Sequence, residues 1–290
     1  MLAHASNKKL CGGLFEALYV ATQTGCQVGN TVAHRSTIGC TSAWRSSLTK
    51  DALSIPENHL IELLPRQEQR RLHAVTEPFC LRLEEVLCEI GQAAPFVYFP
   101  TRGFVSLIAM IDGSPGVELG MVGREGMVGA HLALGVAIAP THVVVQGPGS
   151  AWRIASAAFS EVLESSPYLQ RCLHRYNYVL MTQHINAAAC MRFHQIGPRL
   201  ARWLLMSEDR AQANHFQMTH EFLAFMLGVR RVGITAAAGV LQKDGLIAYH
   251  RGHIRVQDRA GLEAASCSCY ASDARAYKDL LDRPAAKHKA

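Results

Sequence analysis

The chain has 290 residues, 49% of them hydrophobic, which provides apolar material for about two packed domains and excludes disorder throughout. The net charge of +6 is unevenly distributed: residues 192–259 hold 10 Lys and Arg against 5 Asp and Glu, whereas residues 51–191 hold 9 against 13. A local excess of cations is typical of a surface that faces a polyanion such as nucleic acid.

The apolar runs and the cysteines narrow the class of protein further. The longest apolar run, near residues 129–139, is interrupted by His131 and is too short to span a bilayer. Nine scattered cysteines do not resemble a disulfide framework, and Cys267-Ser-Cys269 is a lone CxC without a second pair at zinc-site spacing. We therefore expect free thiols, a cytoplasmic protein without membrane contact, no metal site and no cofactor.

The first half of the chain divides by composition. Residues 1–50 are rich in Ser, Thr, Gly and Asn without a sustained period, and we expect a flexible N-terminal extension there. A domain over residues 51–165 follows, opening with short helices over 57–74. Strand-like segments between residues 79 and 154 then alternate with turns such as Gly147-Pro148-Gly149, a pattern typical of an antiparallel barrel or sandwich.

A helix about 40 Å long is predicted between residues 166 and 195, before Gly197-Pro198 breaks it. Its seam recurs in steps of four and three: Leu169, Leu173, Tyr176, Leu180, Gln183, Ala187 and Cys190. Such a seam can be buried against its own domain or against a second copy of the chain. The narrow two-per-seven stripe with one polar residue favours the two-stranded coiled coil of a homodimer.

Residues 219–243 are predicted to form two short helices joined by a tight turn at Gly228. Apolar residues fall where the two helices must face each other: Leu223, Ala224, Leu227, Val229, Ile234 and Ala237. An ordinary amphipathic helical hairpin and a DNA-binding helix-turn-helix both fit this pattern. Arg230 and Arg231 favour the second, because they open the helix that normally enters the major groove.

The next segment, residues 246–256, alternates as two short strands around the turn-favouring pair Arg251-Gly252. This order is that of a winged helix, so residues 196–262 are assigned to a winged helix-turn-helix domain and residues 263–290 to a C-terminal tail. We expect four cationic or neutral donors on the wing, beside the DNA phosphates: Lys243, His250, Arg251 and Arg255.

The expected DNA contacts centre on the second helix. Arg231 is the predicted base reader, with Arg230 assisting it or holding a phosphate. Val232 or the methyl group of Thr235 is expected against a thymine methyl group. Thr219 is the predicted N-cap of the first helix, whose backbone N–H groups can point at a phosphate.

The order of barrel, long helix, Gly-Pro break and winged helix resembles the Crp/Fnr superfamily of bacterial transcription regulators over about residues 53–270. The similar segments are VYFPTRGFVSL, VGREGMVG, RLARWLL, Asp209-Arg210, EFLAFMLGVRR, GLIAYHRGHIRV and DRAGLE. The resemblance implies an α+β fold: an N-terminal antiparallel, jelly-roll-like β-roll similar to a cyclic-nucleotide-binding sensor, a long dimerisation helix and a C-terminal winged helix-turn-helix. It also implies a homodimer on a palindromic site in double-stranded DNA, with RNA polymerase as a further candidate partner.

The sensor departs from the nucleotide-binding members of that superfamily. Their Gly-Glu pair, which holds the ribose, aligns with Gly129-Ala130, and their Arg-Ser pair, which neutralises the cyclic phosphate, aligns with Ala139-Pro140. A buried phosphate without a cationic partner carries a heavy desolvation penalty. We therefore expect a regulator that acts without cyclic nucleotide.

Two other classes of protein are kept as alternatives. One is a regulator that responds to a cyclic nucleotide or another small ligand and acts through protein–protein contacts. The other is a metal-dependent enzyme, but no HExxH, GxSxG, P-loop or GxGxxG motif occurs, so we expect a non-enzyme. The N-terminal cysteines are also too widely spaced for the iron–sulfur cluster of the oxygen-sensing members: Cys11, Cys26 and Cys40.

Overall fold

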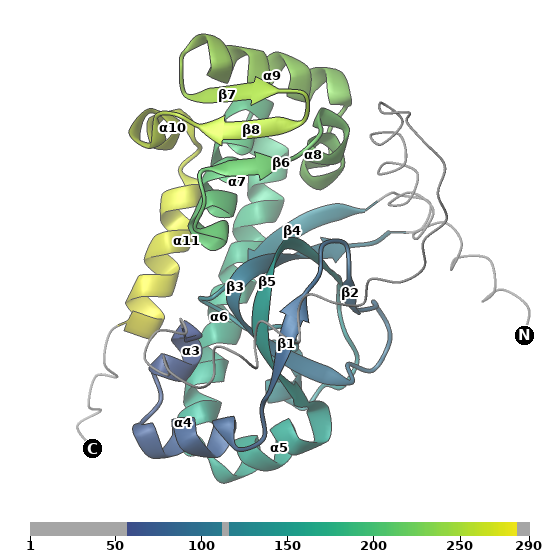
Figure 1. The fold of residues 1–290 in the computed structure, drawn as a ribbon, viewed down its shortest axis with the longest axis vertical. Coiled ribbons are helices and arrows are strands. Elements are labelled where there is room, and N and C mark those ends of the chain that lie inside the picture. The colour runs from purple at the N-terminus through teal and green to yellow at the C-terminus, as the bar shows by residue number, and fades with distance from the viewer. Residues whose placement is uncertain (1–56, 112–115, 283–290) are drawn as a thin grey trace, which may run out of the picture. The chain divides into compact units, whose positions relative to one another are not determined.

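The computed structural model describes residues 57–111 and 116–282, so the expected extension over residues 1–50 lies outside the described residues (Figure 1). The first part contains α3 (His59–Glu62), α4 (Arg66–His73), β1 (Glu77–Leu81), β2 (Val86–Cys88), β3 (Phe96–Ala109), β4 (Val117–Val122), η1 (Ala130–Leu134), β5 (His142–Ala155) and α5 (Ser156–Ser165). The rest contains α6 (Pro167–Phe193), α7 (Ile196–Ala211), β6 (His215–Gln217), α8 (His220–Leu227), α9 (Arg231–Lys243), β7 (Ile247–His250), β8 (His253–Val256), α10 (Arg259–Ala265), α11 (Cys269–Tyr277) and η2 (Lys278–Asp282).

The strands of the first part form the expected antiparallel β-roll, in the order β1-β5-β3-β4, with β2 also paired to β5. The long strands β3 and β5 change register near Gly103, where φ is +74°. A Cβ atom at Gly103 would lie 2.2 Å from the carbonyl oxygen of Gly147, so this close approach needs glycine. The predicted turn at Gly147-Pro148-Gly149 is wrong: the chain passes through it as an irregular part of the single strand β5.

Helix α6 has 27 residues, close to the predicted length, but its seam is buried within the protomer, mostly against the β-roll and at Cys190 against Cys267 and Cys269. Leu169, Leu173 and Tyr176 lie in one core cluster with Phe99 and Phe159. All seven seam residues are buried or half-buried within the protomer: Leu169, Leu173, Tyr176, Leu180, Gln183, Ala187 and Cys190. Burial within the protomer contradicts the assignment to a dimer interface for Leu169, Leu173, Tyr176, Ala187 and Cys190, whereas Leu180 and Gln183 are only half-buried and their assignment stays a prediction. A two-per-seven stripe forms on any long helix that lies along an apolar surface, and the stripe does not reveal which chain supplies that surface.

The break between α6 and α7 comes earlier than predicted. Helix α6 ends at Phe193 and α7 begins at Ile196, so the break precedes Gly197-Pro198. Pro198 lies in the first turn of α7, where its missing N–H leaves no intrahelical hydrogen bond unmade. The pair therefore starts a helix here and does not end one.

The segment assigned to a C-terminal tail contains the packed helix α11, which joins α6 to α7. Asp273 on α11 accepts a hydrogen bond from Asn186 of α6 at 2.7 Å and forms an ion pair with Arg202 of α7 at 2.6 Å. Both members of that ion pair are largely buried, which makes its loss costly. Helix α11 escaped prediction because one of its two buried residues, Asp273, is charged, so that they form no apolar stripe.

Two expectations from composition can be compared with the described residues. No single described helix is long and apolar enough to cross a membrane, although α8 and α9, bent by 109°, pass the same test as a pair. Five described cysteines have free thiols, as expected from the sequence. Cys80 is disulfide-bonded, which contradicts that expectation. The free thiols are those of Cys88, Cys172, Cys190, Cys267 and Cys269.

Candidate nucleic-acid interface

Helices α8 and α9 form a tight turn whose local geometry follows from two residues. The hydroxyl oxygen of Thr219 accepts a hydrogen bond from the backbone N–H of Phe222 at 3.1 Å, which confirms Thr219 as the N-cap of α8. Gly228 ends α8 in the left-handed conformation, with φ +61° and ψ +42°. The two helices are bent by 109° relative to each other, within the range of helix-turn-helix units.

The faces that α8 and α9 turn toward each other are those predicted from the apolar pattern. Leu223 and Ile234 are fully buried, and the remaining predicted positions are buried or half-buried: Ala224, Leu227, Val229 and Ala237. With that face inside, the positions between them on α9 must point outward.

The outward face of α9 begins with an exposed arginine pair. Arg230 is the N-cap residue and Arg231 is the first residue of the helix. Val232 is 72% exposed, and Gly239 has open space around it. Neither arginine forms a salt bridge with any described residue, so both guanidinium groups are available to a ligand.

Thr235 is exposed on the same face, but its hydroxyl group is used within the protein. It donates a hydrogen bond to the carbonyl oxygen of Arg231 at 3.1 Å and lies 3.0 Å from Nδ1 of His220. The His220 ring in turn stacks on Tyr249 of β7, with ring centroids 4.2 Å apart. Thr235 is thus held in place by a chain of contacts that joins α9, α8 and the hairpin.

His220 and Tyr249 were missed by the sequence analysis, because neither a polar N1 residue nor an aromatic strand residue is unusual. Burial, and after it the charge of Arg231, lowers the pKa of His220 below its ordinary value. A neutral ring beside the arginine pair avoids a third positive charge in the cluster. His220 therefore positions the interface as a neutral stacking group.

The hairpin of β7 and β8 has the predicted turn. Arg251 and Gly252 have φ values of +47° and +83°, the two left-handed residues of a type I′ turn, and His250 pairs with His253 across it. Strand β6 adds a third strand beside β8, which was not predicted. Arg251 at the tip is exposed and forms no salt bridge with any described residue.

One predicted wing residue lies elsewhere. Lys243 is the last residue of α9, about 18 Å along the helix from Arg231 at 1.5 Å per residue. It is exposed at the base of the hairpin and not on the wing, so it can only reach a backbone position distant from the base-reading end. The other three wing donors are exposed on the hairpin: His250, Arg251 and Arg255.

Two acidic groups of this domain are paired within the protein. Arg259 of α10 binds Glu208 at 2.8 Å and Asp209 at 2.7 Å, both on α7. These carboxylates are thereby neutralised, while the cations of α9 and the wing are not. Exposed cations without a carboxylate partner among the described residues are expected of a surface that binds phosphates.

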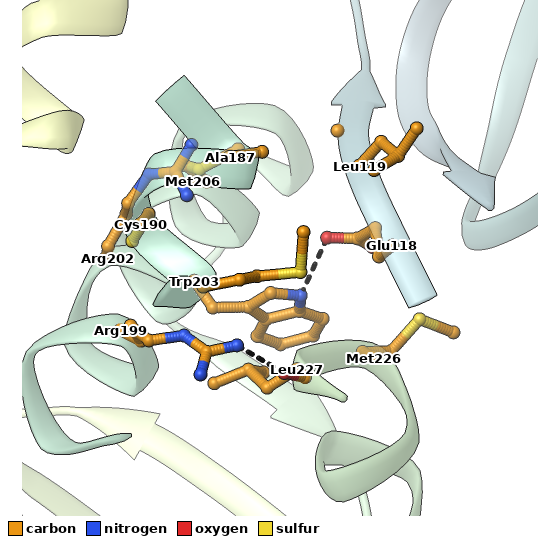
Figure 2. Close-up of a pocket in the computed structure, with 12 residues that line it drawn as sticks. Glu118, Leu119, Ala187, Cys190, Arg199, Arg202, Trp203, Met206, Met226 and Leu227 are labelled. Carbon is orange, nitrogen blue, oxygen red and sulfur yellow. Dashed lines mark hydrogen bonds between the residues drawn. The ribbon is translucent and has the colours of Figure 1, made fainter. Parts of the chain in front are cut away.

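A buried junction joins the β-roll to this domain (Figure 2). Glu118 of β4 accepts hydrogen bonds from the indole N–H of Trp203 at 2.9 Å and from the hydroxyl group of Ser106. Beside it, the Arg199 guanidinium donates to the carbonyl oxygen of Leu227 at the end of α8. Burial raises the pKa of Glu118 to about 7 against the opposing effect of its two hydrogen bonds.

A second cavity, of about 490 Å³, lies between the β-roll and α6. It is lined by all four residues aligned with the nucleotide-contacting pairs: Gly129, Ala130, Ala139 and Pro140. Its lining contains no Lys or Arg, and burial lowers the pKa of both its histidines, His131 and His184. The fold therefore brings the two pairs together around a cavity whose lining carries no fixed positive charge.

Comparison with known proteins agrees with this geometry. Residues 198–265 match the model of the Crp-like helix-turn-helix domain, while no curated protein matches the chain. Similar solved structures include FixK2 from Bradyrhizobium japonicum, with 15% identity, a TM-score of 0.57 and coverage of 67% of this chain and 98% of that chain. The c-di-GMP-responsive global regulator CLP from Xanthomonas campestris has 17% identity, a TM-score of 0.55 and coverage of 66% and 99%.

A transcriptional regulator of the CRP/FNR family from Thermus thermophilus is similar at 20% identity, with a TM-score of 0.54 and coverage of 66% of this chain and 98% of that chain. At these identities the likeness establishes the fold. The chain thus has a Crp/Fnr-type regulator fold, with a cyclic-nucleotide-binding-like β-roll and a Crp-like helix-turn-helix DNA-binding domain. The resemblance drawn from the sequence is confirmed.

The raised pKa of Glu118 predicts a pH dependence. The folded chain keeps a proton on Glu118 between pH 4.5 and about 7, which the unfolded chain releases. This stabilisation is complete below pH 4.5 and is lost as the pH rises through 7, by at most about 1.4 kcal/mol per pH unit. Glu118→Gln should flatten that decline in urea unfolding, whereas the exposed control Glu164→Gln should not. Equal slopes for the wild type and Glu118→Gln would contradict the assignment.

Proposed function

We propose that this protein is a sequence-specific transcription regulator that binds an inverted-repeat site in duplex DNA as a homodimer, without cyclic nucleotide. The observation that carries the proposal is the Arg230-Arg231 pair at the start of α9, which has no ion pair among the described residues and is fixed by the capped helix α8 and the turn at Gly228. The absence of enzymatic activity is part of the proposal, because the chain matches a Crp-like DNA-binding domain and has the fold of transcription regulators. Such a protein acts in the cytoplasm, with RNA polymerase as a candidate partner.

The roles of the interface residues follow from their positions. Arg231 points from the first turn of α9, so its guanidinium can read guanine O6 and N7 in the major groove. Arg230 precedes the helix and suits a phosphate. Val232 and the Thr235 methyl group provide apolar contact for a thymine methyl group. The first N–H groups of α8, after the Thr219 cap, face a backbone phosphate.

The dimer contact is assigned to the outer face of α6, because the inner face is occupied. Tyr178, Met181 and Ile185 are each at least half exposed, and they continue in steps of three and four to exposed Ala188. A row of exposed apolar side chains along a long helix is typical of an association surface. Two copies of α6 packed through this row would bury it and relate the two α9 helices by a two-fold axis.

Absence of cyclic-nucleotide binding is proposed from the cavity lining. A cyclic phosphate entering this cavity would lose its hydration without gaining a cation, which is unfavourable. The same cavity favours one alternative, a regulator that responds to a small uncharged, apolar ligand. Its lining includes Met181 and Ile185 of the proposed dimer face, so a ligand there would lie beside the subunit contact.

Measurements of DNA binding distinguish the proposed base-reading role of Arg231 from the proposed phosphate contact of Arg251. On an inverted repeat with half-sites about 34 Å apart, Arg231→Ala should cost about 1–3 kcal/mol and relax the preference at one base pair. Arg251→Ala should weaken specific and random duplexes alike and reduce the salt dependence, because a phosphate contact carries no base information. Fluorescence anisotropy at several salt concentrations measures both. Equal losses on specific and random DNA for Arg231→Ala would show that α9 is not the reader.

Sedimentation tests the outer face of α6. The double substitution Met181→Asp and Ile185→Asp should give monomers, because like charges would meet across the two-fold axis. The matched control, Leu83→Asp with Ile90→Asp, places the same charges on exposed residues of the β-roll and should leave the dimer intact. A dimer that survives the α6 substitutions would place the contact elsewhere.

Calorimetry tests whether the cavity between the β-roll and α6 binds cyclic nucleotides. Cyclic AMP and cyclic GMP should produce no binding heat at physiological concentrations, because Ala130 and Ala139 stand where a carboxylate and a guanidinium are needed. A micromolar Kd for either nucleotide would refute this expectation and would require other residues to hold the phosphate.

A further inference from the structure

Three cysteines and one histidine from distant parts of the sequence converge at the junction of α6, α7 and α11. Cys190 lies in the last turn of α6, His194 follows that helix, and Cys267 and Cys269 lie at the link from α10 to α11. Their potential ligand atoms all lie within 4.8 Å of one another. The three cysteines are buried and form a cluster of their own, while the histidine is half-buried.

The distances in the cluster are close to those of a tetrahedral metal site. Zinc bonds of about 2.3 Å to sulfur and 2.0–2.1 Å to nitrogen give edges of about 3.8 Å between two sulfurs and about 3.6 Å between sulfur and nitrogen. Sγ of Cys190 lies 3.5 Å from Sγ of Cys267, and Sγ of Cys269 lies 3.6 Å from Nδ1 of His194. Two opposite edges of the tetrahedron are thus already close to the required length.

We propose that Cys190, His194, Cys267 and Cys269 form a closed, mononuclear Cys3His site for a zinc ion. Four protein ligands leave no open position, which is the arrangement of a structural site. Thiolate-rich donor sets select zinc over magnesium or calcium, which prefer oxygen. The compact cluster favours one ion, because an iron–sulfur cluster would place several atoms between its ligands and spread them further apart.

The surroundings suit the charge of such a site. Three thiolates and a neutral histidine around Zn²⁺ carry one net negative charge. Arg202 acts electrostatically on all three cysteines, and its side chain is only 12% exposed. The pairing of Arg202 with Asp273 fixes this cation in place. The site therefore lies beside a buried ion pair whose guanidinium group can interact with the thiolates.

The position of the site gives it a role in the fold. Cys190 and His194 are one helical turn apart at the end of α6, and the backbone N–H of Cys267 donates to the carbonyl oxygen of Pro198 in the first turn of α7 at 3.3 Å. A metal ion here would connect the end of α6 to α11. Because α6 leads into the DNA-binding domain at this point, the ion would stabilise the junction between them. It would fix the angle at which α7 leaves the long helix.

Metal analysis of the full-length protein, isolated under reducing conditions, tests the proposal. We expect one zinc per chain by mass spectrometry and, after exchange to Co²⁺, the visible bands of tetrahedral cobalt with a thiolate charge-transfer band. His194→Ala and Cys269→Ser should lower zinc affinity by more than the 10–100-fold typical of losing a residue that only supports a ligand. Cys172→Ser, a free half-buried thiol outside the cluster, should keep the zinc.

The wild-type cobalt spectrum keeps the test valid if a variant fails to fold. A wild-type protein that takes up neither zinc nor cobalt would overturn the proposal, as would undiminished zinc affinity in both ligand variants. A Cys190–Cys267 disulfide in the chain isolated without reductant would assign the pair to redox chemistry and also overturn it. Iron-based visible absorption would overturn the mononuclear zinc assignment.

Discussion

The packing of the inner face of α6 on the β-roll is the contact on which the rest of the structure depends. Leu173 and Val179 are fully buried in it, and replacing one such leucine by alanine typically costs about 2–5 kcal/mol. This burial fixes the rotation of α6 about its own axis. Residues three and four apart share a helix face, so the same rotation leaves Met181 and Ile185 outside. The face of α6 proposed for association is thus the one that the β-roll leaves uncovered.

The turn of the helix-turn-helix rests on the β-roll as well as on its own helices. A Cβ atom at Gly228 would meet Cγ2 of Val117 at 3.1 Å, and Met226 lies 3.3 Å from the Gln146 amide. Together with the bond between Glu118 and Trp203, these contacts join β4 and β5 to α7 and α8. A change in the position of β4 would therefore act directly on the turn that orients α9. The raised pKa of the buried Glu118 carboxyl group predicts that this junction is sensitive to pH.

The candidate nucleic-acid interface combines a rigid backbone with exposed arginine side chains, which suits DNA recognition. The Thr219 cap, the stacked pair of His220 and Tyr249, and the hydroxyl contact of Thr235 hold the backbone of α8, α9 and the hairpin together. The arginines that project from this frame have no ion pair among the described residues. A rigid frame lowers the conformational entropy lost on binding, and unpaired guanidinium groups need not give up a carboxylate partner before meeting DNA.

Sequence by itself determined the features that depend on neighbouring residues. The N-cap at Thr219, the left-handed residue at Gly228 and the turn at Arg251-Gly252 follow from backbone preferences within a few positions, so the winged helix-turn-helix and its exposed arginines could be predicted. The alternation of short strands likewise predicted an antiparallel roll, although the joining of two of them into β5 depended on how Gly103 and Gly147 approach each other.

Only the tertiary structure decided the features that depend on contacts between distant residues. A heptad stripe has the same spacing whether the roll or a second chain covers it, so the partner of Leu173 could not be read from its period. The lone CxC gained Cys190 and His194 only when α11 folded back onto α6, across more than 70 residues of sequence. Glu118 likewise lies at the junction because it accepts a hydrogen bond from Trp203, 85 positions away in the sequence. Periodicity and caps record local geometry, whereas these contacts depend on how the whole chain packs.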